Sequence, residues 1–320
     1  MHKGTTIYRT LECRPDSYWD WYQQGNTQRD WGYYQDALFS YDKAIEYQPS
    51  SYWAWYRRGN VLDELEDYKA AVSSYDQALS IRPRDYWAWY ERASVLRQLG
   101  RYEEAVISYD KALQARPTDY WAWYNRGQVA VKHLHWYEEA IASFEIALEI
   151  SPTDYWAWYR RGEALRLLGR DQEAIASYEQ ALETRPNDYW AWYRRGDACK
   201  HGGDLNAAIT AYNKALDVRP NDYWAWYQRG EVLRQLGQDA DALLSYERSL
   251  EVAPDDDNSL YNKACCYAKL NQIDLAMENL QQAIKLNQGK YQQLAKSNPN
   301  FESFLKDQRC ETLILALTHV

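Results

Sequence analysis

Apolar and aromatic side chains recur at intervals of three and four residues through most of the chain. The stretch from residue 68 to residue 79 is one example, and its apolar positions are Tyr68, Ala71, Val72, Tyr75, Ala78 and Leu79. This spacing places all of them on one side of an amphipathic α-helix. Pro83 follows, and because proline cannot continue a helix, the helix is predicted to end just before it.

Another predicted helix precedes this one, and a polar residue marks its start. Ser51 stands immediately before the aromatic run Tyr52–Tyr56, and aspartate takes the same place in five other copies of the run. An oxygen at this position accepts the free backbone N–H groups of the first helical turn. Each copy therefore predicts two helices joined by a turn and closed by a proline. The equivalent prolines are Pro49, Pro117, Pro152, Pro186, Pro220 and Pro254.

The aromatic run is the most regular feature of the sequence. Its seven copies hold fourteen of the sixteen tryptophans. The first tyrosines of the copies are Tyr18, Tyr52, Tyr86, Tyr120, Tyr155, Tyr189 and Tyr223. They are 34 residues apart, except for one step of 35, and we expect the additional residue in the turn around His133–Trp136. Internal repeats of this length indicate a helical array.

Three regions follow from the repeats. Residues 18–287 are predicted to hold eight tandem units, which begin near residues 18, 52, 86, 120, 155, 189, 223 and 257. Residues 1–17 are an N-terminal extension. Residues 288–320 are predicted to form a C-terminal helical cap, because the last repeat of an array must cover its apolar face. The apolar positions of this cap are Tyr291, Leu294, Phe301, Phe304, Leu305, Leu313, Ile314 and Leu317.

The repeat resembles the tetratricopeptide repeat (TPR) family. Two copies carry the family's pattern of Trp, Gly, Ala, aromatic, Ala and Pro as Trp55, Gly59, Ala71, Tyr75, Ala78 and Pro83, and as Trp158, Gly162, Ala174, Tyr178, Ala181 and Pro186. The resemblance implies an all-α fold, a right-handed α-solenoid whose first helices line a concave face where peptides and proteins dock. The YWAWYxRG style also resembles cyanobacterial TPR proteins, which implies assembly of photosynthetic or other large complexes.

A helical wheel separates the aromatic residues of the first helix into two groups. At about 100° per residue, Trp55 falls with Ala54, Gly59 and Leu62, so Trp55 and its equivalents are predicted to lie in the core. Trp53 and Tyr56 fall on the opposite side, which predicts two aromatic rows on the concave face. The tryptophan row is Trp19, Trp53, Trp87, Trp121, Trp156, Trp190 and Trp224. The tyrosine row is Tyr22, Tyr56, Tyr90, Tyr124, Tyr159, Tyr193 and Tyr227.

The aromatic surface of these rows is larger than a monomer usually leaves exposed to water. Each ring offers about 150–250 Å² for burial, and even half of the tryptophan row exceeds the apolar patch of about 300–600 Å² usual on a monomer. In one interpretation each tryptophan stacks on a tyrosine of the neighbouring repeat and stiffens the array. In the other, both rows are a binding platform, because Trp and Tyr are enriched at binding hot spots. The sequence leaves both open.

Charged and polar residues accompany these rows. One row beside the tryptophans is Asn26, Asn60, Ser94, Gln128, Glu163, Asp197 and Glu231, and a mostly basic row is Arg29, Asp63, Arg97, Val131, Arg166, Lys200 and Arg234. Family members that grip acidic chaperone tails have Lys, Arg and Asn where the aromatic rows stand here, so that role is not expected. Arg58 and its equivalents are expected to pair with a carboxylate of a neighbouring repeat, with binding of an anionic partner as the alternative.

Composition narrows the function further. The chain has 320 residues with 46% hydrophobic and 26% charged positions and a net charge of −9, which disfavours a general nucleic-acid binder. Five irregularly placed cysteines favour reduced thiols in the cytoplasm. Neither a signal peptide nor an apolar stretch of spanning length is expected. His133 and His135 are only a weak signal for a metal site. Cys265 and Cys266 are expected to be buried. We expect that the chain binds no cofactor and is not an enzyme.

Three functions remain, in order of preference. The first is a non-enzymatic scaffold or assembly factor that binds a peptide or helix of a partner protein along the aromatic groove. The alternative is a binder of a planar or apolar small ligand, such as a sugar chain, pigment or lipid. The third is single-stranded RNA binding by stacking, which the net charge disfavours. Oligomeric state and peripheral association with a membrane complex stay open.

Overall fold

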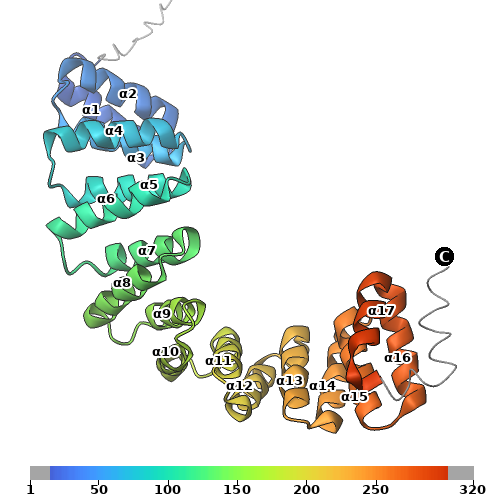
Figure 1. Cartoon of the computed structure of the whole chain (residues 1–320). Helices are drawn as coiled ribbons and strands as arrows, with labels where there is room; N and C mark the ends of the chain where they lie inside the picture. Colours follow the sequence, from blue (N-terminus) through green and yellow to red (C-terminus); the bar gives the residue numbers. More distant parts are fainter. Residues whose placement is uncertain (1–14, 302–320) are drawn as a thin grey trace, which may run out of the picture. The chain divides into compact units, whose positions relative to one another are not determined.

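A computed structural model describes residues 15–301, and within that range every regular element is a helix. Consecutive helices pack against each other as pairs, and within each of two compact units the second helix of a pair packs against the helix that follows it (Figure 1). One compact unit ends at Pro152, and the other begins at Thr153. The all-helical paired architecture is the α-solenoid that the sequence predicts.

The bounds of the helices follow the repeat. In the first unit they are α1 Tyr18–Asp30, α2 Tyr34–Tyr47, α3 Tyr52–Glu64, α4 Tyr68–Ile81, α5 Tyr86–Gln98, α6 Tyr102–Ala115, α7 Tyr120–Val129 and α8 Tyr137–Ile150. In the second unit they are α9 Tyr155–Leu167, α10 Asp171–Thr184, α11 Tyr189–His201, α12 Leu205–Val218, α13 Tyr223–Gln235, α14 Asp239–Val252, α15 Asp257–Lys269, α16 Ile273–Leu286 and α17 Gln288–Ser297. Odd-numbered helices from α1 to α15 are the first helices of their pairs.

The predicted helix starts are confirmed. The Ser51 hydroxyl accepts the backbone N–H of Ala54 at 3.3 Å, and the Asp85 carboxylate accepts that of Ala88 at 2.9 Å. Both residues have extended backbone conformations just before their helices. A side-chain oxygen at this place thus satisfies a backbone donor that the helix itself leaves free.

The additional residue of the 35-residue step lies partly inside a helix. The first helix of the fourth pair ends in a π-helical turn, Ala130–Leu134, where the expected place was the turn around His133–Trp136. A π-turn absorbs one residue by widening the helix, so the later residues keep their packing. His135 then takes the left-handed conformation, with φ of 57°, that Gly100 and Gly169 take in other repeats.

In six of the eight described helix pairs, a glycine of the first helix faces an aromatic ring of the second helix. A Cβ on Gly59 would lie 2.7 Å from Cε1 of Tyr75, and one on Gly127 would lie 2.8 Å from Cε1 of Phe144. The rings of Tyr75 and Phe144 are almost completely buried. Glycine at these positions lets the first helix approach the second helix within ring contact, and the third pair has Ala93 at the equivalent position.

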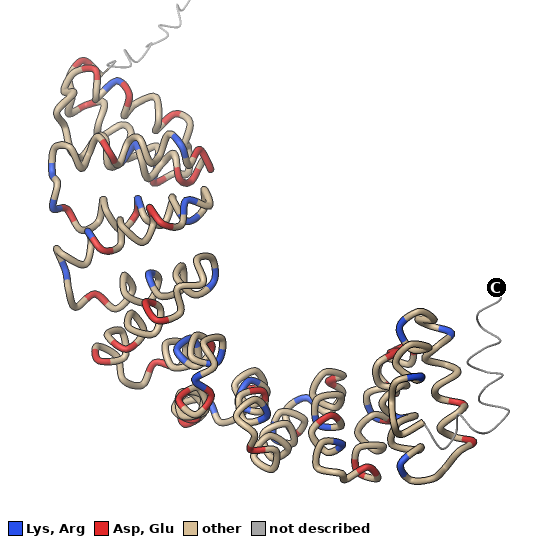
Figure 2. The backbone as a smooth tube through the Cα atoms, viewed as in Figure 1, with Lys and Arg blue, Asp and Glu red and all other residues tan. Residues whose placement is uncertain are grey.

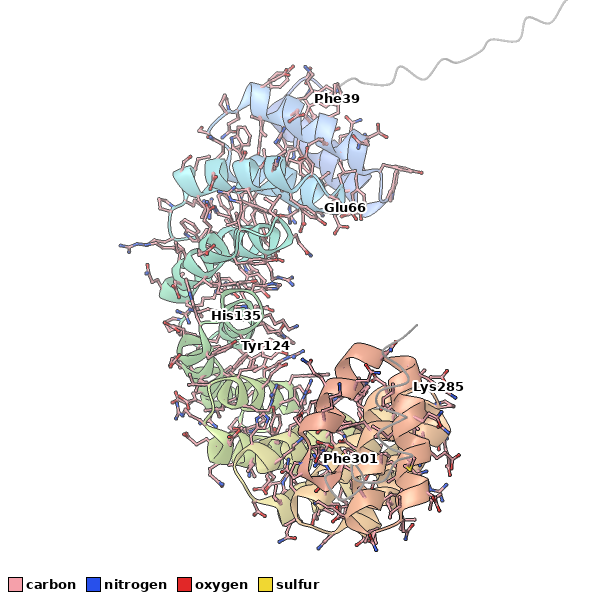
Figure 3. All side chains as sticks on the ribbon, turned by 45° about the vertical axis from the view of Figure 1, so that its right-hand side comes forward. Phe39, Glu66, Tyr124, His135, Lys285 and Phe301 are labelled. Atoms are coloured by element: carbon pink, nitrogen blue, oxygen red, sulfur yellow. The ribbon has the colours of Figure 1, made fainter. Side chains whose placement is uncertain are left out.

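The last described helix packs on the eighth pair. Tyr291 of α17 lies 5.0 Å from the ring of Tyr261, and Phe301 lies 6.0 Å from it, as ring centroids. Tyr291 and Phe301 are both buried, and Phe301 is labelled in Figure 3. The C-terminal cap over residues 288–320 stays a prediction, because residues 302–320 and the N-terminal residues 1–14 lie outside the described range.

Candidate functional site: the tryptophan row

The tryptophan row is exposed throughout the described repeats. Trp53 of α3 keeps 45% of its surface accessible, and every other member is exposed to a similar or larger extent. The row lies near the N-terminal ends of the first helices, because each of its residues follows the first residue of its helix. We call the side of the first helices that carries these rings the first-helix face.

The tyrosine row is not exposed, which corrects the expectation for Tyr56 and its equivalents. Tyr56 keeps only 8% of its surface, and Tyr124, labelled in Figure 3, keeps 7%. The buried members are Tyr56, Tyr124, Tyr159 and Tyr193, and Tyr22, Tyr90 and Tyr227 are half-buried. The reason is the second helix: Tyr56 packs against the ring of Tyr75 at 6.0 Å, in the seam between α3 and α4.

The tyrosines support the tryptophans from inside each repeat. The ring of Trp53 meets Tyr52 at 5.0 Å and Tyr56 at 6.1 Å, both nearly edge to face. These are the ring contacts of Trp53 among described residues, and they come from its own helix. The ladder in which each tryptophan stacks on a tyrosine of the neighbouring repeat is therefore not formed at Trp53. About half of its surface stays open to a partner.

Trp55 and its equivalents are half-buried, where the helical wheel predicts full burial. The indole N–H of Trp55 donates to the carbonyl of Pro49 at 2.8 Å, and Trp89 bonds Pro83 in the same way. A tryptophan whose ring is partly buried usually donates its indole N–H to a polar partner. This bond ties the first helix to the proline turn that precedes it, so these tryptophans are structural.

Several polar residues of the first-helix face are also structural. The Tyr75 hydroxyl donates to Asn60 at 2.9 Å, and the Tyr212 hydroxyl donates to Asp197 at 2.9 Å. The pairing predicted for Arg58 is confirmed, since its Nε donates to Asp42 of the preceding pair at 2.6 Å. Lys and Arg are interspersed with Asp and Glu along both units (Figure 2). The pairing of Arg58 within the chain, rather than with an anionic partner, is thus the interpretation that the structure supports.

A hollow of about 470 Å³ opens on the first-helix face of the second unit. Its lining includes Trp190, Trp224, Arg166, Arg194 and Lys200. Arg194 pairs with Asp197 at 3.0 Å, and Lys200 donates to Gln228 at 2.8 Å. Two tryptophans and several polar hydrogen-bonding groups can therefore contact the same ligand here.

The first unit carries a half-buried acid, Glu91 of α5. Burial, with a smaller contribution from the nearby Asp63 carboxylate, raises the pKa of Glu91 to about 7. The charge of Glu91 also raises the pKa of the half-buried Tyr90, for which burial is the larger cause. Glu91 is thus a group that titrates near neutrality.

The histidines and cysteines that the sequence singled out as weak candidates for chemistry make ordinary packing and hydrogen-bond contacts. His133 stacks on Tyr102 with centroids 4.0 Å apart, and the His135 ring nitrogen lies 3.2 Å from the Tyr137 hydroxyl. Among residues 15–301 there is no cluster of His, Cys, Asp and Glu that could hold a metal ion. Cys265 and Cys266 are buried as predicted. No helix of the described part is long and apolar enough to cross a membrane.

These features define a class of protein: a helical repeat array in which the first helix of each described pair from α1 to α13 exposes a tryptophan. Models of the tetratricopeptide repeat match residues 22–86, 56–120, 108–142, 155–188, 177–210, 196–237, 223–256 and 257–290. A model of the protein prenyltransferase alpha subunit repeat matches residues 137–168. The chain belongs to the tetratricopeptide repeat family.

Solved structures show the same fold at low sequence identity. The C-terminal part of a TPR repeat-containing protein from Cytophaga hutchinsonii matches with a TM-score of 0.62 and 18% identity, covering 78% of this chain and 99% of that chain. YrrB, described as a TPR protein with an unusual peptide-binding site, matches with a TM-score of 0.52 and 23% identity, covering 59% and 98%. MamA matches with 0.51 and 19%, covering 53% and 92%.

A comparison with curated proteins returned no match. The family itself sets the general function, because TPR arrays are protein-interaction scaffolds that typically have no catalytic activity. The family therefore implies protein partners for this chain.

Proposed function

We propose that this chain is a non-enzymatic scaffold that binds a peptide or helix of a partner protein along the first-helix face. The tryptophan row makes the contacts, and the tyrosine row holds the tryptophans in place without touching the partner directly. Large rings with few rotatable bonds lose little entropy on binding, which is why Trp is common at hot spots.

The exposure of the tryptophan row is the observation that carries this proposal. The first unit holds Trp19, Trp53, Trp87 and Trp121, each at least 45% exposed. With about 250 Å² for a tryptophan, these rings present roughly 500 Å² in one unit. This area equals the largest apolar patch of a typical monomer, about 300–600 Å², and such patches are often functional. The peptide-binding site named for YrrB supports the same use of this fold.

A small planar or apolar ligand is the second candidate, and the hollow beside Trp190 and Trp224 favours it. Its volume of about 470 Å³ lies within the range of about 300–1,000 Å³ usual for ligand pockets. This candidate predicts saturable quenching of tryptophan fluorescence by a small molecule without any protein present. The scaffold predicts the same quenching only when a protein segment is added.

Affinity capture from the native cell, read by mass spectrometry, tests the proposal. Wild type is compared with the triple variant Trp87→Ala, Trp121→Ala, Trp156→Ala, and thermal melts check that both fold. The matched control is Trp31→Ala, which removes a tryptophan that is 70% exposed but lies outside the row. We expect that wild type and the control capture protein partners that the triple variant no longer captures. Retention of all partners by a folded triple variant would overturn the proposal.

A further inference from the structure

The hollow on the first-helix face of the second unit holds more positive than negative charge. Arg166, Arg194 and Lys200 line it, and Asp197 is the one acid among the described residues of its lining. All four residues are half-buried. Water screens a half-buried charge less than an exposed one, so an uncompensated charge at such a place attracts an opposite charge more strongly.

Within residues 15–301, only one of these three cations has an ion pair. Nη1 of Arg194 lies 3.0 Å from the Asp197 carboxylate. The ammonium of Lys200 donates to the neutral side-chain oxygen of Gln228 at 2.8 Å. Nε of Arg166 is buried and has no hydrogen-bond partner among the described residues. The positive charges of Arg166 and Lys200 are therefore not compensated by this part of the chain.

Acids in the neighbouring repeats of the second unit are engaged with other residues. Glu163 takes the position of Asp197 in the preceding repeat, and it pairs with Arg160 at 2.7 Å. Glu231 takes that position in the following repeat, and it pairs with Arg234 at 3.4 Å. Neither acid lines the hollow, so its surplus of positive charge stays available to a ligand.

The equivalent positions of the first unit carry the opposite charge. The residues that correspond to the three cations of the hollow are, in the same order, Asp63, Glu91 and Arg97. The tryptophan beside them is Trp87, which is 47% exposed, as is its equivalent Trp190 in the second unit. The aromatic surface is thus common to both units, and the positive charge beside it belongs to the second unit alone.

We propose that this hollow binds an acidic segment of a partner protein. An aspartate or glutamate side chain of the partner lies at Arg166 and Lys200, because a guanidinium holds both oxygens of a carboxylate and an ammonium adds a further charged donor. An apolar side chain next to that acid packs on Trp190 and Trp224, which are 47% and 58% exposed. This inference rests on the proposed function, for which it names the chemistry of the partner.

The net charge of the whole chain does not prevent this contact. That charge is −9, but it is the sum over 320 residues. At physiological ionic strength, exposed charges more than about 8 Å apart are largely screened from each other. A carboxylate inside the hollow therefore interacts mainly with the residues of its lining, which carry three cations and one acid.

Indole N–H spectra of the whole, ¹⁵N-labelled chain test the proposal directly. The probe is the peptide acetyl-Ala-Glu-Leu-Glu-Ala-amide, whose blocked ends leave the two side chains as its only carboxylates. We expect saturable shifts of the Trp190 and Trp224 signals and little change at Trp87, where the neighbouring charges are reversed. The matched peptide acetyl-Ala-Gln-Leu-Gln-Ala-amide keeps the shape without the charge, and it should bind about ten-fold more weakly, the size of one charge-assisted hydrogen bond.

A double variant removes the two uncompensated charges from the hollow. In Arg166→Gln, Lys200→Gln we expect the glutamate peptide to bind about ten-fold more weakly, no better than the glutamine peptide. The matched control is Lys214→Gln, which removes an exposed cation of α12 outside the lining and should bind as wild type does. Thermal melts check that both variants fold. In wild type, added salt should weaken the glutamate peptide and leave the glutamine peptide unchanged, because salt screens charges.

Several results would overturn the inference. Equal affinity of the glutamate and glutamine peptides, no shift with either, or a response of Trp87 as large as that of Trp190 would each do so. Acetate that shifts the same signals with the affinity of the peptide would make the hollow a site for a small anion instead. Cellular capture separates the two proposals: if the triple tryptophan variant loses partners that the double variant still captures, this inference fails and the scaffold function stands.

Discussion

Replacing Glu91 by glutamine should stabilise the protein at alkaline pH but not at acidic pH. Burial, and to a smaller extent Asp63, raises the pKa of the Glu91 carboxyl to about 7 from 4.5. A raised pKa means that the folded state holds the proton more tightly than the unfolded state. The free energy of unfolding that this group contributes is therefore fully present below about pH 4.5, and it is lost as the pH rises through about 7.

The size of the effect follows from the two pKa values. Each pKa unit corresponds to about 1.4 kcal/mol, so a difference of about 2.5 units sets a ceiling of about 3 kcal/mol. Solvent reaches the half-buried side chain of Glu91 and screens its charge. We therefore expect about 1–2 kcal/mol at pH 8.5. Glutamine keeps the shape of the side chain and carries no charge to bury.

Urea unfolding followed by tryptophan fluorescence measures this prediction. With a dependence on urea of about 2–3 kcal/mol per molar, Glu91→Gln should raise the midpoint by about 0.5 M at pH 8.5 and change it little at pH 5. The control is Glu103→Gln, an exposed acid in the first turn of α6, which should show no such dependence on pH. A lower midpoint for Glu91→Gln at pH 8.5, or an equal shift at both values, would refute the reasoning.

Two further predictions concern the packing of the repeat. Gly59→Ala should lower the free energy of unfolding by about 1–3 kcal/mol, because its Cβ would lie 2.7 Å from the Tyr75 ring. Gly289→Ala, whose Cβ meets nothing within 4 Å, should be neutral or stabilising in the same urea assay, and a loss as large as that of Gly59→Ala would contradict this explanation. Trp55→Phe should cost about 0.5–1.5 kcal/mol, because the bond to the Pro49 carbonyl is lost; an unchanged melting temperature would show that this bond contributes nothing.

The sequence alone was sufficient for every feature that depends on local chemistry or on repetition. Ser51 marks a helix start because its oxygen accepts a nearby N–H of the same turn. The 34-residue period gives the paired helices and the α-solenoid, because each repeat must bury the same apolar stripe against the next. The ion pair of Arg58 with Asp42 could also be predicted from the sequence. The same two positions recur in the chain, and a half-buried guanidinium requires a partner.

The tertiary structure decided which of the aromatic side chains are open. A helical wheel gives the direction of Trp53 and Tyr56 from their own axis, and both point away from the apolar stripe. It does not show how far the second helix reaches, and the ring of Tyr75 covers Tyr56 while it leaves Trp53 exposed. The stack of Arg82 on Tyr52 likewise joins residues that only the turn of the helix pair brings together. The sequence specifies in which direction a side chain points from its own helix. Whether that side chain is buried depends on the neighbouring helices that pack against it.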